Sequence, residues 1–286
     1  MLGNDFGNLV SAEIFQLRKR VGTWVLLGIW CGLAMLFGYI VPYFGLADEG
    51  PVSARLAPML PDQIVSTMLD GVPFFGGALA LILGVMTVGG EFGWDTFKTL
   101  FTQRPGRGTV FAAKMVALGI ALVPFIVVMF ALGGIASSLI ALTEDATISW
   151  PSVATVVQGI GAGWLILATW AAIGVILAVA TRGTSLAIGI GILYTLVIEG
   201  LLSALAGSFS LLEPLVDFFV RANAYSLVKP LGGAGAAGSA GSAATDGPGA
   251  FSGPYVDWQQ AALVLVAYLV ALLGVSTWVM RRRDVA

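Results

Sequence analysis

The sequence predicts an all-α integral membrane protein, a single transmembrane domain over residues 1–286. Its mean hydropathy is +0.93. Only 10% of its residues are Asp, Glu, Lys or Arg, whereas a soluble domain has about 25%. The chain also contains apolar runs that match the roughly 20 residues a helix needs to cross a bilayer. We expect six transmembrane helices, an interfacial amphipathic helix at the N-terminus, and external half-helices before the last span.

The six spans are expected in stretches that carry almost no charged residues. The third and fourth are longer than one crossing requires, which is compatible with tilt or an interfacial extension. A cleavable signal peptide is the alternative for the first, but Val21–Ala47 exceeds the roughly 7–15 apolar residues of such a peptide. The expected spans are residues 23–41, 71–90, 112–142, 153–180, 184–206 and 259–280.

The basic residues predict that both termini are cytoplasmic. Lys and Arg in short loops favour the cytoplasmic side, and this orientation leaves only Arg55, Arg221 and Lys229 outside. The net charge of -2 indicates no particular partner, and we expect no nucleic acid among the partners. The basic residues expected inside are Arg18, Lys19, Arg20, Lys98, Arg104, Arg107, Lys114, Arg182, Arg281, Arg282 and Arg283.

Residues 1–22 are expected to form the amphipathic helix. Apolar residues recur there at helical spacing while polar residues occupy the other faces, which is typical of a helix along a membrane interface. Two interpretations stay open: a connecting helix that touches a cytoplasmic partner, or a simple interfacial anchor. The apolar residues are Phe6, Val10, Ile14, Leu17 and Val21.

Two longer segments are expected outside. Residues 42–70 contain four prolines and four acidic residues, which predicts an irregular loop with short helical turns. Residues 207–257 begin with an apolar part that Pro214 and Pro230 interrupt, and we expect half-helices buried in protein there. A segment rich in Gly, Ala and Ser follows, and its composition is typical of a flexible linker.

Several classes of chemistry are excluded by residues that the sequence lacks. It contains no histidine and one cysteine, Cys31, which excludes imidazole metal sites, His-based triads and internal disulfides. It also lacks the G-x-x-x-x-G-K-[ST] pattern of a nucleotide-binding loop. We therefore expect no catalytic residue, metal or cofactor on this chain, and any ATP hydrolysis on another polypeptide.

Residues 91–111 are the charged interruption between the second and third spans. Thr96 to Phe101 can continue a helix, and the sequence Arg104-Pro105-Gly106-Arg107 then breaks it, because proline disfavours helix at the preceding residue. Lys114 follows at the inner edge of the third span, where a lysine can extend its ammonium group toward water. The segment therefore predicts a short interfacial helix, a basic turn and a long helix.

This loop resembles that of ABC-2 type transporter permeases, often written E…GT…LLT-x-P-x-[SG]-R…K. The matching residues are Glu91, then Asp95-Thr96 before "FKTLFT", then "QRPGR", and Lys114 seven residues on. Asp95 stands where the family commonly has glycine. The motif covers about 24 residues, whereas the architecture of an amphipathic helix, six spans and half-helices agrees over nearly the whole chain.

The resemblance implies a permease subunit of the bacterial inner membrane, bound to two separate ATPase subunits that hold ATP and Mg, and to a second permease, identical or related. It also implies that the loop docks on the ATPase. The alternative is that its cations only enforce topology and bind anionic lipid. The residues to which the docking role is assigned are Glu91, Thr96, Lys98, Arg104, Pro105 and Arg107.

Glu199 is the one carboxylate that can lie within the membrane. It is either part of a transport pathway or, as we prefer from its position late in the fifth span, in contact with external water. For the whole chain we expect an ATP-driven exporter of a hydrophobic or amphipathic compound. A secondary transporter or channel, a non-transporting membrane scaffold and an intramembrane enzyme are the alternatives; the last is disfavoured by the missing histidines.

Overall fold

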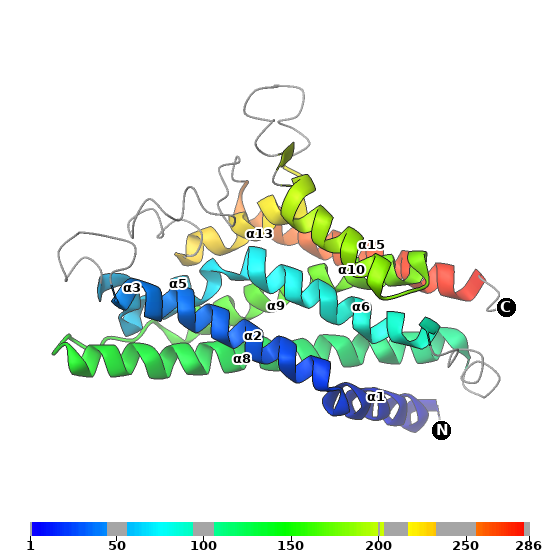
Figure 1. Ribbon diagram of the computed structural model, residues 1–286, viewed down its shortest axis with the longest axis horizontal. Helices are drawn as coiled ribbons and strands as arrows, with labels where there is room; N and C mark the ends of the chain where they lie inside the picture. The colour runs from blue at the N-terminus through cyan, green and yellow to red at the C-terminus, as the bar shows by residue number, and fades with distance from the viewer. Residues whose placement is uncertain are drawn as a thin grey trace.

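We describe a computed structural model over residues 2–44, 56–93, 106–199, 201–202, 217–232 and 256–282. All the regular structure in these residues is helical and none of it is strand, which confirms the all-α fold class. The helices lie mostly along the long axis of the molecule (Figure 1). Five helices in the described ranges are long and apolar enough to cross a membrane. The chain is therefore a multi-pass membrane protein.

The first two helices meet at a bend. Helix α1 (Leu2–Lys19) ends before Arg20, whose extended backbone starts α2 (Val21–Met35). The π-helical turn η1 (Leu36–Ile40) and the short α3 (Val41–Tyr43) continue the same rod. Helix α1 packs beside the start of α8, so its apolar side contacts protein. Its contact with a membrane interface stays a prediction.

The second span begins earlier than expected. The 3-10 turns η2 (Ala57–Met59) and η3 (Pro61–Gln63) lead into α5 (Ile64–Asp70), η4 (Val72–Gly76) and α6 (Gly77–Gly93). The prediction of an irregular external loop was therefore wrong for residues 64–70. Val65, Met68 and Leu69 are buried because they recur at helical spacing on one face, and the π turn at η4 accommodates Pro73 without ending the helix.

The third and fourth spans form two long helices. Helix α8 (Arg107–Thr143) has 37 residues, so it is roughly 55 Å long, well beyond a bilayer core of about 30 Å. Helix α9 (Val153–Thr181) has 29 residues, and the hydroxyl of Ser152 caps it by accepting the Thr155 N–H at 3.1 Å. Both spans were expected to be long, and both are.

Helices α6 and α9 form the centre of the molecule. Their backbones approach so closely that a Cβ atom on Gly84 would collide with the carbonyl of Ala171, and one on Gly174 would collide with the carbonyl of Leu81. Close contact between small residues is a common way for membrane helices to pack. Any side chain at either glycine would therefore force the two helices apart.

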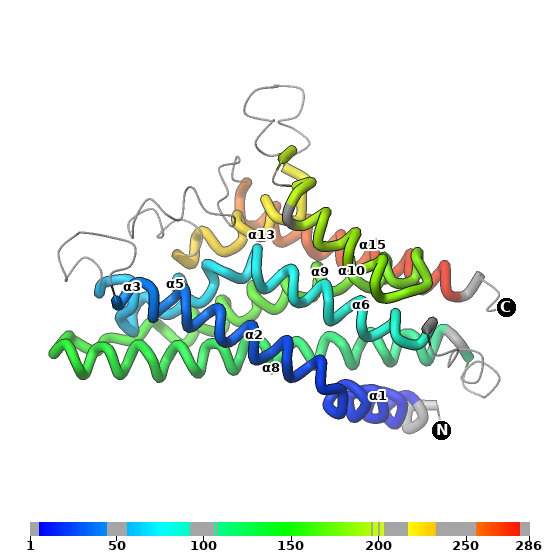
Figure 2. The backbone as a smooth tube through the Cα atoms, viewed as in Figure 1, coloured from blue at the N-terminus to red at the C-terminus, as the bar shows by residue number. Residues whose placement is uncertain are grey.

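The rest of the chain is α10 (Ser185–Leu193), η5 (Tyr194–Ile198), α13 (Val220–Val228), η6 (Lys229–Leu231) and α15 (Trp258–Arg282). The run from α10 is not among the five candidate spans, so the count of six stays a prediction. Figure 2 shows α10 with η5 leading away from the end of the molecule that holds α1, and α15 returning to it. That path is compatible with an even number of crossings. Helix α13 is a short helix in the region where half-helices were predicted.

Candidate functional site

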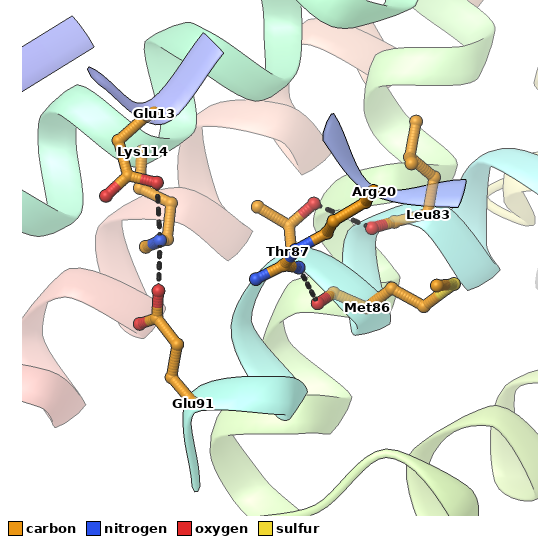
Figure 3. A network of polar contacts seen from close by, with 7 residues as sticks. All are labelled: Glu13, Arg20, Leu83, Met86, Thr87, Glu91 and Lys114. Carbon is orange, nitrogen blue, oxygen red and sulfur yellow. Dashed lines mark hydrogen bonds and ion pairs between the residues drawn. The ribbon is translucent and has the colours of Figure 1, made fainter. Parts of the chain in front are cut away.

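The most concentrated group of buried charges joins three helices at the base of the 91–111 loop. The Lys114 ammonium group on α8 donates to Glu13 Oε2 on α1 at 2.6 Å and forms a second ion pair with Glu91 Oε1 on α6. Figure 3 shows the ammonium group between the two carboxylates. We call Glu13, Lys114 and Glu91 the inner triad.

The side chains of the inner triad are buried, so their charges are removed from water. The exposed fractions of the side chains are 1% for Lys114, 5% for Glu91 and 13% for Glu13. A charge that leaves water in this way costs several kcal/mol unless a partner compensates it. Each of the two carboxylates pairs with the same ammonium group, so each of the three helices is bound to the others through Lys114.

The sequence explains how the triad assembles. Glu91 lies in the last turn of α6 and Lys114 in the second turn of α8, so the loop that joins these helices brings the two residues to the same level. Glu13 lies beside the apolar stripe of α1, the side that packs on α8. The triad therefore depends on α1 folding back over the ends of both helices.

A second contact fastens the α1–α2 bend to α6. Arg20 lies at the bend, and its Nη1 donates to the carbonyl oxygen of Met86 at 2.6 Å (Figure 3). The next residue, Thr87, donates its hydroxyl hydrogen to the carbonyl oxygen of Leu83 within α6. The N-terminal segment is thus held to α6 at two levels, Met86 and Glu91.

The predicted loop residues are only partly described. Glu91 is in the triad, and Arg107 is the first residue of α8. Thr96, Lys98, Arg104 and Pro105 lie outside the described residues. The sequence indicated that the Lys114 ammonium group extends toward water. That prediction was wrong, because the ammonium group pairs with two carboxylates inside the protein.

Glu13 was missed by the sequence analysis. It reads as one polar residue on the outer face of an amphipathic helix, and nothing near it in the chain indicates a distant lysine. The available signal was its place next to Ile14, on the edge of the apolar stripe, where a carboxylate becomes partly buried once the stripe packs on a neighbour.

Glu199 is the second buried carboxylate. Its Oε1 accepts the Tyr194 hydroxyl at 2.5 Å and the Val220 N–H at 3.2 Å, and its Oε2 accepts the Arg221 N–H at 3.1 Å. The side chain is fully buried. The preferred interpretation, that it reaches external water, was therefore wrong; whether it lines a transport pathway stays a prediction.

The geometry gives Glu199 a structural task. It receives the first two N–H groups of α13, which have no partner within their own helix, and Phe219 at the N-cap position supplies no side-chain acceptor. All nine residues of α13 are buried, and the Arg221 guanidinium lies over the rings of Phe74 at 4.9 Å and Tyr225 at 5.7 Å. We call Glu199, Tyr194 and the start of α13 the outer cap.

Neither group of residues has the arrangement of a catalytic centre. Within the described residues, no cluster of three or more His, Cys, Asp or Glu could hold a metal ion. The inner triad and the outer cap use their carboxylates to accept from protein donors, and they join helices. Their arrangement suits the transmission of movement between helices rather than bond chemistry.

Comparison with known proteins agrees with this description. The model of the family described as "ABC-2 family transporter protein" matches residues 9–198, more than half of the chain, and the match includes all three residues of the inner triad. A comparison with curated proteins found no match. The chain therefore belongs to the ABC-2 family, whose members are membrane components of transporters, are not themselves the catalytic subunits, and partner with ABC ATPase subunits.

Proposed function

We propose that this chain is the permease subunit of an ATP-driven exporter in the bacterial inner membrane, with both termini in the cytoplasm. Two separate ATPase subunits bind ATP and Mg, and a second permease, identical or related, completes the complex. The cargo is a hydrophobic or amphipathic compound. Family membership supports the class of transporter, and the inner triad supports the mechanism.

The observation that carries the mechanism is the position of the inner triad at both ends of the 91–111 loop. Glu91 lies where the chain enters the loop, and Lys114 lies just after it leaves. The ion pairs join these two points to each other and to α1. A force on the loop would therefore move α1, α6 and α8 together rather than bend one helix.

The packing of α6 supports onward transmission. Because Gly84 and Gly174 bring the backbones of α6 and α9 into contact, α9 must follow α6 when α6 tilts. An ATPase that binds one arrangement of these helices more tightly than another shifts the permease toward the first. ATP binding and hydrolysis on the partner would alternate the two arrangements.

A secondary transporter is the competing function, and Glu199 is the residue on which it depends. Such transporters use intramembrane carboxylates to bind coupling ions. Both oxygens of Glu199 already accept from protein donors, which favours the helix cap over an ion site. Among the described residues, no feature specifically favours a channel or a non-transporting scaffold.

Loss of the ATPase from a loop variant tests the docking. We expect Arg104→Glu with Arg107→Glu to remove the ATPase that co-purifies with the full chain from native membranes, because the partner surface would then face two carboxylates instead of two guanidinium groups. The matched control is Arg281→Glu with Arg282→Glu, which reverses two charges elsewhere on the predicted cytoplasmic side. Normal co-purification with the loop variant would refute the docking role.

A second variant separates docking from transmission. Glu13→Gln leaves the loop sequence intact but replaces one charge-assisted contact of Lys114 with a weaker one. We expect the ATPase to remain bound while the permease loses much of its effect on the rate of ATP hydrolysis in proteoliposomes. An unchanged hydrolysis rate would contradict the proposed role of the inner triad, and loss of the ATPase would show that α1 itself docks.

A further inference from the structure

A groove runs along the side of the molecule between α8, α9 and α15. It consists of two adjoining cavities of about 420 and 430 Å³, which share Met115 on α8 and Leu273 on α15. Volumes of this size are typical of sites for small ligands. We call these two cavities together the α8–α15 groove.

Small residues create the groove. Its floor is formed by Ala168, Ala171 and Ala172 on α9, and helices α8 and α15 each pack on α9 on either side. Gly119 on one wall and Gly274 on the other add no side chain. The wall at Gly119 is fixed, because the Trp164 indole N–H donates to the carbonyl oxygen of Gly119 at 2.9 Å.

The residues that line the groove change from apolar to partly polar along its length. Its deeper part is lined by aliphatic side chains and Trp164, whereas the shallower part reaches Thr277 and Trp278 near the end of α15. Tryptophan is enriched where membrane helices meet the interface. Helix α15 ends one turn later with Arg281 and Arg282. The apolar groove therefore opens beside the basic end of α15.

The length of the groove fits one leaflet of a bilayer. Its α8 wall extends from Ala112 to Val123, which at about 1.5 Å per residue is roughly 17 Å. Half of a bilayer core is about 15 Å. A hydrocarbon chain that enters at Trp278 would therefore reach the middle of the membrane within the groove.

We propose that the α8–α15 groove binds an acyl chain of an anionic phospholipid from the leaflet on the side of Arg281 and Arg282. Basic residues at the end of a membrane helix attract anionic headgroups, α15 ends with two arginines one turn beyond Trp278, and the apolar lining takes the hydrocarbon. A helix from a second copy is the competing occupant, and cross-links between two copies would reveal it. The site is independent of the ATPase and of the cargo.

Photolabelling tests the acyl chain. The full chain is reconstituted in bilayer nanodiscs that contain phosphatidylglycerol with a diazirine on one acyl chain, and labelled peptides are mapped after irradiation. We expect labelling to concentrate on the residues that line the groove in α8 and α15. Labelling spread evenly over the exposed faces of α2 and α8 would overturn the proposal.

Filling the groove is the sharper test. A Cβ atom at Gly274 meets no atom within 4 Å, so Gly274→Leu occupies the groove without a clash. It displaces about two methylene groups of the lipid, and we expect labelling to fall about tenfold. Gly161→Leu is the matched control, because Gly161 is also exposed on a spanning helix with open space around its Cβ position and lies outside the groove.

Two further outcomes decide the case. Equal labelling of the Gly274→Leu and Gly161→Leu proteins would overturn the proposal, provided that both show the native elution volume and unfolding midpoint. Cross-links between two copies at α8 or α15 would assign the groove to a second permease instead.

The preference for an anionic headgroup is tested separately. Arg281→Gln with Arg282→Gln should lower labelling by the phosphatidylglycerol probe about fivefold per arginine, with no change for a phosphatidylcholine probe. Equal losses for both probes would overturn the proposed preference for an anionic headgroup.

Discussion

The inner triad and the outer cap both bury carboxylates, but they satisfy them in different ways. In the triad, two carboxylates share one ammonium group, and the three side chains come from three helices. In the cap, the Glu199 carboxylate accepts from two backbone N–H groups and one hydroxyl. The hydrogen-bond donor in the triad is one ammonium group, whereas the hydrogen-bond donors in the cap are three neutral groups.

The difference teaches which site a single substitution should damage more. Removal of the cation from the triad leaves two buried carboxylates side by side, with like charges that repel and water excluded. Removal of the carboxylate from the cap leaves neutral donors without an acceptor, which costs less. One substitution should therefore remove most of the stability that the triad contributes, whereas the cap should lose stability in steps as its hydrogen bonds are removed one at a time.

The largest effect is expected for Lys114→Met. It keeps a side chain of similar length but leaves Glu13 and Glu91 without their shared cation, and we expect a loss of about 3–5 kcal/mol in the free energy of unfolding. Denaturant titration of the purified full chain in detergent measures this loss. Lys19→Met on the exposed side of α1 is the matched control and should leave the midpoint unchanged.

A rescue variant distinguishes charge from packing. When Glu13→Gln and Glu91→Gln are added to Lys114→Met, no buried charge is left, and we expect most of the lost stability to return. If the triple variant is as unstable as Lys114→Met alone, the side chains matter for their shape rather than their charge. The contrast with the outer cap would then disappear.

An intermediate effect is expected for Glu199→Ala. The Val220 and Arg221 N–H groups and the Tyr194 hydroxyl would lose their acceptor inside the protein, which should cost about 2–3 kcal/mol. Hydrogen exchange should increase at the first turn of α13 and remain unchanged at the first turn of α9, which Ser152 caps. Equal protection of α13 in the variant and the native chain would show that Glu199 does not cap it.

The smallest effect is expected for Tyr194→Phe. It removes one hydrogen bond to Glu199 and keeps both backbone contacts, so we expect a loss of about 1–2 kcal/mol, measured by the same titration. Tyr43→Phe is the control: its hydroxyl donates to Glu144 at 3.0 Å on the exposed surface, where solvent replaces the contact, and stability should not change. A larger loss for Tyr194→Phe than for Glu199→Ala would contradict the stepwise loss of stability expected for the cap.

The fold class was predictable because hydropathy is a local property of the sequence. The runs at 112–142, 153–180 and 259–280 each appear as one helix, within a few residues of the expected bounds at most ends. The run at 64–70 was misread because its prolines indicated a loop, although Pro61 starts the helical segment and Pro73 is accommodated in a π turn. Local turn signals could not show that these residues are buried against α8 and α9.

The sites were predictable only in part. The family pattern identified Glu91 and Lys114, but the sequence did not indicate that they pair, nor that Glu13 is the third member, because a contact over 101 residues leaves no local signal. Glu199 was recognised as unusual from its apolar surroundings. Its role as a cap required the position of α13, which comes from a segment 21 residues further along the chain.

The close approach of α6 and α9 also restricts where a solute can cross. With the Gly84 and Gly174 backbones touching the opposite helix, no opening can form along this seam unless α6 and α9 separate. A conduit for cargo therefore has to use other faces of these two helices.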